Sequence, residues 1–334
     1  MHRTTILIGT LGALLVAAAA RARAPASEVE AHVAAARAAA GQEYRATFVN
    51  LCLPAAPRGA GPGPRAGGPP ATPDRSAWYA SPYKVFDNLY WLGTRQHSSW
   101  ALRTSAGLIL IDTNFAWATQ PEIIDGLTTL KLDPRDIKYV IISHAHGDHD
   151  QGAAELQRRY GAKVVMGTAD WEATLQRPAT AAGGVPTRGT GEVTVGPAGT
   201  KITLGDTTVT IVATPGHTPG TLSYVFPVKD QGKTVMVAYS GGTLTGAFGT
   251  DAARWDEYIA SQKKIAGVAA EVGAAVILSN HSEYDGAYTK ARLVPLKREP
   301  GEENPFLVGT DGVQRYFTVM AECATASKLR LGAK

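Results

Sequence analysis

The sequence contains two successive blocks of short apolar runs, and this arrangement restricts the possible folds more than any other feature. In the first block, runs typical of β-strands cover residues 85–92, 100–104, 107–112, 139–143 and 163–166. In the second block, such runs cover residues 201–204, 207–213, 221–226, 234–239 and 275–278. A continuous apolar run such as residues 107–112 favours a strand that is covered on both faces.

Helices are expected between and after these strands, at residues 120–130, 151–160 and 251–272. This order departs from the strict strand–helix alternation of a doubly wound sheet. Two sheets packed together, with the helices outside, agree better with the way secondary-structure layers bury their apolar faces. We therefore predict an α/β fold, a four-layer αββα sandwich with two strand-rich halves.

The chain of 334 residues is long enough for a substantial core, but its charge does not indicate a nucleic-acid partner. The formal net charge is +4, and residues 1–24 contribute three arginines and no acidic residue. Without that segment the net charge would be +1. A surface that neutralises phosphates is therefore not predicted, and we expect no nucleic-acid binding.

Residues 1–24 have the pattern of a secretory signal peptide. Arg3 precedes an apolar run over residues 5–20, and small residues permit cleavage near Ala22 or Ala24. The alternative is a membrane anchor that stays attached, although the run is shorter than the roughly 20 residues of a spanning helix. We expect an exported, periplasmic protein without stable membrane contact after removal of the signal.

The rest of the chain divides into three expected parts. Residues 25–76 form an amino-terminal arm and a Pro/Gly-rich linker, with ordered structure beginning near Trp78. The main domain covers residues 77–300, and the segment 301–334 ends in a docking helix at residues 312–329. The two cysteines, Cys52 and Cys323, either form one disulfide in an oxidising compartment or remain two separate buried thiols.

A cluster of metal-ligand residue types directly follows the strand at residues 139–143. It consists of His144, His146, Asp148 and His149. Imidazole and carboxylate groups suit Zn²⁺, and side chains on a loop that leaves a strand can converge on one point. A buried group of imidazoles without a partner would be costly, so the cluster predicts a metal site.

Two further histidines also follow predicted strands. His217 lies in a Pro/Gly turn after residues 207–213, and His281 follows residues 275–278. Together with the cluster they give six donors, which suit two ions with three protein ligands each. Such a set leaves coordination positions open for water or substrate, as catalytic sites require.

This order of motifs, over about residues 83–285, resembles the metallo-β-lactamase superfamily. The resemblance implies the metallo-β-lactamase fold and two Zn²⁺ per chain. It implies that His144, His146 and His217 bind the first zinc, and that Asp148, His149 and His281 bind the second. It also implies that Asp112, at the end of its strand, braces the metal loop from outside, as ligands usually require.

One departure from the wider superfamily narrows the resemblance. Many members resemble one another in having a metal-bridging aspartate after the strand that corresponds to residues 235–239, where this chain has no carboxylate. The chain is therefore most similar to the third subclass (B3) of class B β-lactamases. This implies a zinc-dependent hydrolase that uses a metal-bound hydroxide to open the β-lactam ring of antibiotics.

In this interpretation Asp148 is also catalytic, because it orients the nucleophile, while His97 and Ser282 are candidate residues of the substrate rim. The expected partner is a small-molecule substrate, and the sequence does not define an oligomeric state. Two alternatives stay open. One is a hydrolase of the same fold that acts on a lactone, a thioester or a small ester, and the other is a non-catalytic zinc-binding protein.

Overall fold

The computed structural model describes residues 26–53, 72–178, 180–189, 192–243, 248–296, 299 and 302–333. The predicted signal peptide and most of the Pro/Gly-rich linker lie outside these ranges. Within them, no helix combines the length and the apolar character needed to cross a bilayer.

Seven strands form the first sheet, and they lie in chain order from β1 to β7. The pairs from β1 to β4 are antiparallel, whereas those from β4 to β7 are parallel. The strands are β1 (Tyr83–Lys84), β2 (Leu89–Gly93), β3 (Ser98–Thr104), β4 (Gly107–Ile111), β5 (Ile137–Ile141), β6 (Lys163–Gly167) and β7 (Val193–Val195).

The second sheet has five strands in the order β12-β11-β10-β9-β8. Its pairs are antiparallel except for β11 and β12, which run parallel. The strands are β8 (Thr200–Leu204), β9 (Thr207–Ala213), β10 (Leu222–Asp230), β11 (Lys233–Ser240) and β12 (Val276–Ser279).

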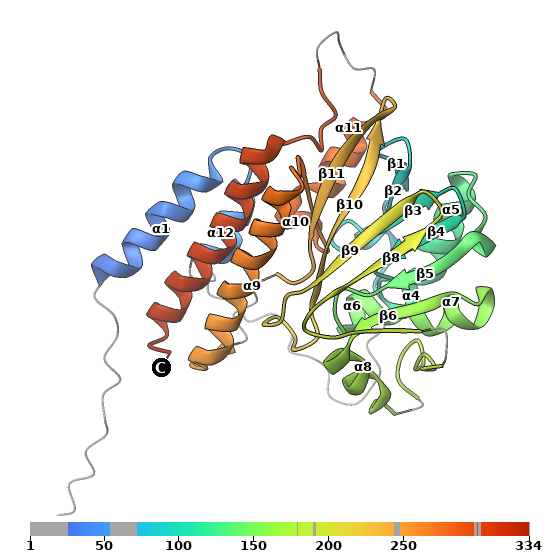
Figure 1. Ribbon diagram of the computed structural model, residues 1–334, viewed down its shortest axis with the longest axis horizontal. Helices are drawn as coiled ribbons and strands as arrows, with labels where there is room; N and C mark the ends of the chain where they lie inside the picture. Colours follow the sequence, from blue (N-terminus) through green and yellow to red (C-terminus); the bar gives the residue numbers. More distant parts are fainter. Residues whose placement is uncertain are drawn as a thin grey trace, which may run out of the picture.

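Apolar side chains from both sheets meet between them and form the central core. Large buried members include Trp91 and Trp100 from the first sheet and Tyr224 and Tyr239 from the second. Strands with apolar side chains on both faces require a further layer on each outer side. Helices provide it, so the predicted four-layer αββα sandwich is confirmed (Figure 1).

Helices on the outer side of the first sheet pack against a separate apolar cluster. They are the π-helical η1 (Thr119–Ile124), α5 (Asp125–Thr129), α7 (Ala153–Tyr160) and α8 (Thr168–Leu175). The short helices α4 (Ala116–Ala118) and α6 (Gly147–Asp150) precede η1 and α7 in the chain. The outer side of the second sheet is covered by α9 (Ala252–Glu271), with α12 (Gly309–Arg330), α1 (Ala26–Ala40) and α2 (Arg45–Cys52) further along. Shorter helices are α3 (Arg75–Trp78), η2 (Pro134–Asp136), α10 (Ser282–Asp285) and α11 (Ala287–Leu293).

The amino-terminal arm differs from the prediction, because ordered structure begins at α1 rather than near Trp78. Helix α1 lies beside α12, and the side chains of Tyr44 and Phe48 are buried in the apolar cluster on that side. The alanine-rich sequence of α1 lacks a strong apolar stripe. Its small side chains instead permit close contact with α12, which a pattern of large apolar residues would not reveal.

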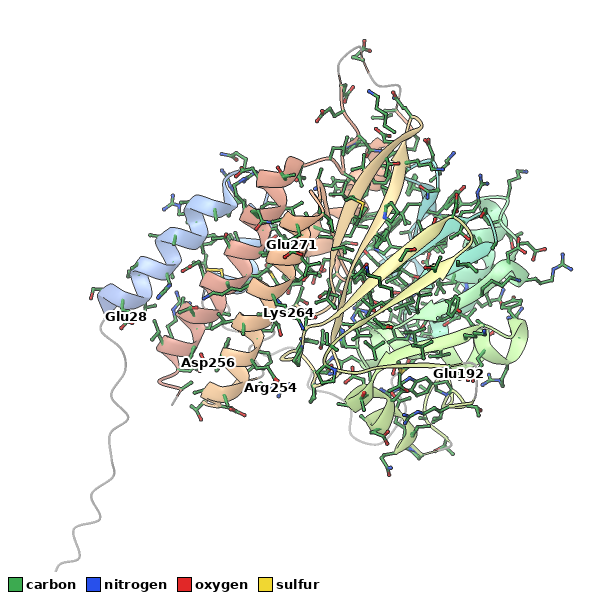
Figure 2. All side chains as sticks on the ribbon, in the orientation of Figure 1. Glu28, Glu192, Arg254, Asp256, Lys264 and Glu271 are labelled. Carbon is green, nitrogen blue, oxygen red and sulfur yellow. A yellow bond between two sulfur atoms is a disulfide. The ribbon has the colours of Figure 1, made fainter. Side chains whose placement is uncertain are left out.

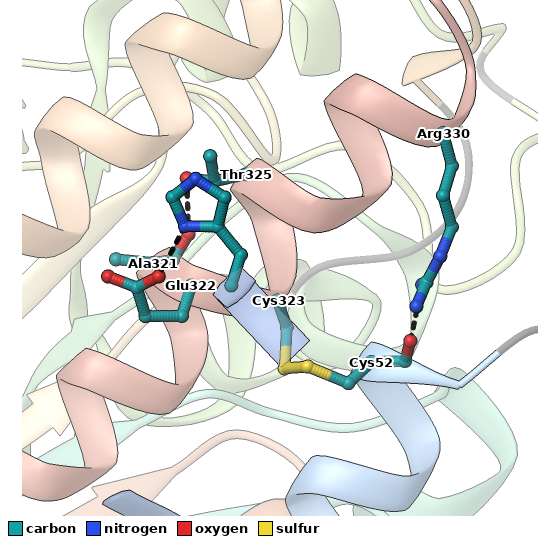
Figure 3. The surroundings of a disulfide bond; sticks show 7 residues. Cys52, Ala321, Glu322, Cys323, Thr325 and Arg330 are labelled. Carbon is teal, nitrogen blue, oxygen red and sulfur yellow. Dashed lines mark hydrogen bonds and ion pairs between the residues drawn. A yellow bond between two sulfur atoms is a disulfide. The ribbon is translucent and has the colours of Figure 1, made fainter. Parts of the chain in front are cut away.

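The two cysteines form a disulfide between the carboxyl end of α2 and the middle of α12 (Figure 3). Their Cα atoms are 4.6 Å apart, across a sequence separation of 271 residues. Nearby, Arg330 donates a hydrogen bond to the carbonyl of Cys52. The amino-terminal helices are therefore attached to the last helix both covalently and by packing.

Smaller differences follow from local turns. The run predicted as one strand at 85–92 is interrupted, because the amides of Val85 and Phe86 both donate to the carbonyl of Leu89 and close a turn between β1 and β2. Residues 193–195, between the two predicted blocks of strands, form β7, which extends the first sheet next to β6.

Candidate metal centre

Each predicted metal ligand lies just beyond a strand, and these strand ends meet at one edge of the sandwich. The loop after β5 carries the cluster from His144 to His149, the turn after β9 carries His217, and His281 follows β12. Nε2 of His217 lies 3.1 Å from Nδ1 of His146. Nε2 of His281 lies 3.2 Å from Nε2 of His149. Side chains far apart in sequence thus converge on one site.

The first donor set consists of His144, His146 and His217, whose ligand atoms all lie within 4.8 Å of one another. Nδ1 of His144 is 2.9 Å from the carbonyl oxygen of Gly241. Since a carbonyl can only accept, Nδ1 carries the proton and Nε2 carries the lone pair. This Nε2 is buried and has no hydrogen-bond partner among the described residues. A buried lone pair that faces two other imidazoles fits a metal ion.

The second donor set is centred on Asp148. Its Oδ2 lies 3.1 Å from Nε2 of His149 and 3.4 Å from Nε2 of His281. These spacings match the edge of about 3.3 Å between ligands of a tetrahedral zinc with bonds of about 2.0 Å. The rings of His144 and His149 have centroids 4.3 Å apart, so the two sets are adjacent. The geometry fits a pair of ions.

His97, predicted as a residue of the substrate rim, also lies next to the second donor set. Its Nε2 is 3.6 Å from Oδ2 of Asp148, and its side chain is only 14% exposed. Its ligand atom is within 4.8 Å of those of Asp148 and His281. The loop between β2 and β3 folds inward over the metal loop, so His97 lies beside the second donor set as well as at the edge of the neighbouring cleft.

Ser282, the other predicted rim residue, is buried between two loops. Its amide donates to the carbonyl of Gln96 at 2.8 Å, and its hydroxyl lies 3.2 Å from that of Ser98. The structure therefore gives Ser282 a packing role instead of a place on the rim.

Asp112 lies directly beneath the metal loop and contacts it at several points. Its carboxylate accepts from the amide of Ser143 at 2.7 Å, from the hydroxyl of Ser143 at 2.8 Å and from the hydroxyl of Tyr239 at 2.9 Å. Its Oδ2 is 3.2 Å from Nδ1 of His149. The backbone of Asp112 has φ +58°, a left-handed conformation that is strained for a residue other than glycine. Asp112 thus lies against both the backbone of the metal loop and the His149 ring, where it can orient that ring.

Asp170, which is not among the predicted site residues, joins the two loops that carry the first donor set. Asp170 lies on α8, and its carboxylate accepts from the amides of Ala145 and Gly220 at 2.7 and 3.0 Å. It also accepts from the hydroxyl of Thr218 at 2.8 Å. Only its position in the first turn of a helix distinguishes it in the sequence, because its partners are distant along the chain.

Arg254, labelled in Figure 2, holds the turn of His217 from the other side. Its guanidinium donates from α9 to the carbonyl oxygens of Gly216 and His217 at 3.0 and 2.7 Å. The backbone on both sides of this ligand is therefore fixed by long-range hydrogen bonds. The sequence gives no sign of this contact, since a helical arginine is usually solvated.

Burial keeps most of the imidazoles neutral. It lowers the pKa of His144 well below the usual value and, with the neighbouring histidines, lowers the pKa of His217 and of His97 to about 3. Burial acts in the same direction on His149, but the carboxylates of Asp148 and Asp112 raise its pKa to about 10. Burial alone would raise the pKa of Asp148, yet His149 and His281 hold it well below the usual range. The second set therefore favours a positive charge next to Asp148, which a cation can supply.

A cleft of about 360 Å³ opens beside the second donor set. Its walls are mainly aromatic, and Trp78 and Trp117 face each other with ring centroids 4.7 Å apart. The lining consists of Pro73, Ala77, Trp78, Thr94, Gln96, His97, Phe115 and Trp117. Because His97 belongs both to the cleft and to the donor set, a molecule in the cleft would lie next to the metal centre.

An αββα sandwich with two adjacent His/Asp donor sets at its strand ends has the architecture of a metal-dependent hydrolase. The sequence profile of the metallo-beta-lactamase superfamily matches residues 92–230. The chain is similar to this superfamily, and the resemblance that the motifs predicted is confirmed.

Two solved structures show the similarity over most of their length. BJP-1, a subclass B3 metallo-beta-lactamase of Bradyrhizobium japonicum, is 29% identical, with a TM-score of 0.60 over 73% of this chain and 91% of that one. FEZ-1, a metallo-beta-lactamase from Legionella gormanii, is 26% identical, with a TM-score of 0.61 over 74% of this chain and 94% of that one. The predicted similarity to subclass B3 is thereby confirmed.

Among curated proteins, a hydroxyacylglutathione hydrolase of Neisseria meningitidis is 37% identical over 110 residues. The match covers 31% of this chain and only 37% of the length of that protein. Together with the structural matches, it supports a metal-dependent hydrolase as the class of protein.

Proposed function

We propose that this protein is a di-zinc hydrolase that opens the β-lactam ring of antibiotics. The proposal depends above all on one observation, the two adjacent donor sets that meet at the sandwich edge beside an aromatic cleft. Imidazole-rich sites of this kind suit zinc, although they accept other divalent ions. The similarity to BJP-1 and FEZ-1, both described as metallo-beta-lactamases, supports this substrate class.

A zinc pair bound by these residues would supply Lewis acidity toward a carbonyl group and would lower the pKa of a coordinated water. The chain's own groups then do the positioning. The three contacts of Asp148 with histidines all use Oδ2, so Oδ1 is the oxygen that can accept a hydrogen bond from the nucleophile and orient it. Asp112 keeps the ring of His149 in place, which preserves the position of Asp148 during the reaction.

The aromatic cleft beside His97 supplies the binding surface. Trp78, Phe115 and Trp117 offer flat apolar faces, and β-lactam antibiotics carry apolar or aromatic substituents next to the reactive amide. A substituent in the cleft would hold the ring amide near the donor sets. The cleft therefore favours a small organic substrate, in agreement with the expected small-molecule partner.

The end of β11 favours the β-lactamase interpretation over other members of the superfamily. Many superfamily members have a metal-bridging aspartate at this strand end. Here the hydroxyl of Tyr239 donates to Asp112, and the carbonyl of Gly241 accepts from Nδ1 of His144. This strand end contributes a buried hydrogen-bond network and no carboxylate. No carboxylate from this strand end would therefore bridge the two ions.

A second candidate is hydrolysis of a thioester. The match to a hydroxyacylglutathione hydrolase, 37% identical over 110 residues, favours this alternative. The aromatic cleft does not separate the two candidates, because a thioester also presents a carbonyl for attack. The missing bridging carboxylate at the end of β11 favours the β-lactam.

Turnover assays separate these candidates. Purified, zinc-loaded protein is incubated with penicillins, cephalosporins and carbapenems, and in parallel with chromogenic thioesters, lactones and small esters. We expect β-lactam turnover that disappears in His146→Ala. Turnover of thioesters or lactones alone would replace the proposal with the second candidate. Silence on both panels, with zinc still bound, would instead support a non-catalytic zinc-binding protein.

We also propose that the protein is exported to the periplasm. The signal-like segment 1–24 supports this location, and so does the Cys52–Cys323 disulfide, since disulfides persist in oxidising compartments. Cell fractionation with amino-terminal sequencing of the mature protein tests the proposal. A mature chain that begins just after Ala22 or Ala24 is expected, and a cytoplasmic protein that retains Met1 would refute export.

A further inference from the structure

The loop between β2 and β3 is joined directly to the loop that carries His281. His97 and His281 form an isolated antiparallel bridge. The amide of Ser98 donates to the carbonyl of Asn280 at 2.9 Å, and the amide of Ser282 donates to the carbonyl of Gln96 at 2.8 Å. In such a pair the bonded groups flank the two opposed residues, whose side chains then project close together from the same face. The His97 and His281 rings accordingly have centroids 4.9 Å apart.

A tight turn fixes the backbone of His97. Gly93 has φ +136°, and a Cβ built there would lie 2.3 Å from the carbonyl oxygen of His97. The amide of Thr94 donates to that same carbonyl at 2.9 Å. The Thr94 hydroxyl oxygen accepts in return from the amides of Gln96 and His97. Only glycine permits this close approach, so the turn is built to present residue 97.

The imidazole of His97 is oriented as well as buried. Its Nδ1 lies 3.1 Å from the Thr94 hydroxyl, and its Nε2 faces Oδ2 of Asp148 at 3.6 Å. The edge contact with Phe115, with ring centroids 5.0 Å apart, blocks rotation on the other side. One ring nitrogen held by a polar partner, with the other directed at the site, is the arrangement typical of metal-ligating histidines.

From this geometry we infer that His97 is a fourth protein ligand of the second metal ion, in addition to Asp148, His149 and His281. The Asp148 oxygen lies 3.1, 3.4 and 3.6 Å from the nitrogens of the three histidines, close to the edge of about 3.3 Å of a zinc tetrahedron. The inference rests on the metal centre proposed above but not on the identity of the substrate.

With three imidazoles and one carboxylate, the second ion would have all four positions of a tetrahedron filled by protein, whereas the first ion would have only three protein ligands. Sites with four protein ligands are typically structural, whereas catalytic sites keep an open position. The set of His144, His146 and His217 would then hold the ion that receives water and substrate. The second ion would mainly fix the loops and hold Asp148 in place.

Two measurements test the inference. Stepwise zinc binding is followed by competition with a chelator in the wild type, in His97→Ala and in Arg95→Ala, which removes an exposed side chain from the same loop. Loss of an outer partner of a ligand lowers metal affinity about 10- to 100-fold, so loss of a ligand should weaken the second binding step by about 100-fold or more. In His97→Ala, the zinc affinity of the first step should stay within about threefold of the wild-type value. In Arg95→Ala, the zinc affinities of both steps should do so, which is less than the 10- to 100-fold loss expected for an outer partner.

Wild-type protein loaded with cadmium-113 and labelled with nitrogen-15 gives the direct readout, and it does not depend on the folding of any variant. We expect scalar coupling between the metal and Nε2 of His97. Two bound ions without this coupling, or equal affinities in His97→Ala and the wild type, would overturn the inference and leave the proposed function intact. A wild type that binds no metal would instead refute the metal centre as a whole.

Discussion

Asp170 provides a demanding test of how the first donor set is held. Its carboxylate is buried and accepts three hydrogen bonds, two of them from the backbone amides of Ala145 and Gly220. In Asp170→Ala these two amides lose their partner inside the protein. A buried donor left unsatisfied costs about 1–3 kcal/mol, so we expect the free energy of unfolding to fall by about 3–5 kcal/mol.

Asp170→Asn should have a smaller effect. The amide oxygen can still accept one of the backbone hydrogen bonds, but the NH₂ group faces a donor. We expect a loss of about 1–3 kcal/mol. Both variants should also bind the first zinc more weakly, because the loops that carry His146 and His217 are no longer joined.

Urea denaturation of the metal-free protein, together with chelator competition for zinc, measures both effects. Glu172→Ala is the matched control, since Glu172 lies on the same helix and forms an exposed ion pair with Arg188. Its effect should stay within about 1 kcal/mol. If Asp170→Ala matched this control in stability and in zinc affinity, the inference that Asp170 joins the ligand loops would be wrong.

Three further predictions follow from buried or covalent features. Burial raises the pKa of Glu122 from 4.5 to about 8, so the folded protein keeps a proton that the unfolded chain has lost, and stability should fall as pH rises between these values. The variant Glu122→Gln keeps the acceptor for the amide of Ala80. In urea denaturation it should be about 2–4 kcal/mol more stable than the wild type at pH 8 and nearly equal to it at pH 4.5. An equal gain in stability at both pH values would contradict this. Replacing Cys52 and Cys323 together by serine should lower stability by about 2–5 kcal/mol, and an unchanged unfolding midpoint would show that the disulfide contributes little. Removal of metal by a chelator should lower Tm and zinc should restore it, whereas a Tm that does not depend on metal would contradict a structural contribution from the ions.

Much of the fold follows from patterns that are local in sequence. Residues 207–213 alternate and end in a Pro/Gly turn, and the structure has β9 over the same residues. In the parallel strands β5 and β6, the apolar stretches at residues 140–141 and 164–166 are buried, because both faces of the sheet are covered there. The helix predicted at 251–272 corresponds to α9 within one residue at each end, where the side chain of Asp251 caps the first turn.

The amino-terminal helices could not be placed in the same way. Helix α1 gains its position from contacts with α12, nearly 300 residues later, and from the link at Cys52. Sequence spacing shows that two cysteines can pair but does not give the distance between them. The weak apolar pattern of α1 therefore predicted an amino-terminal arm outside the ordered domain, where the structure has a packed helix.

In the candidate site, too, the features that are local in sequence could be predicted, and those that depend on long-range contacts could not. Its six predicted donors stand next to strand ends, and a strand end fixes where a side chain points. The positions of His97 and Asp170 beside the donor sets could not be predicted in this way, because they depend on contacts with loops that are distant in sequence. The turn at Gly93 and Thr94 was the only local signal for His97, and it indicated a bend without showing which way the ring would face.

The most direct test of the central claim is a metal count on purified protein, loaded with zinc and freed of unbound ions. The wild type should retain two ions per chain, and His146→Ala and His281→Ala should each retain about one, because each substitution removes a ligand from a different set. A wild type with no tightly bound ion, or two variants that both keep two ions, would contradict the convergence of these side chains on a pair of metal sites.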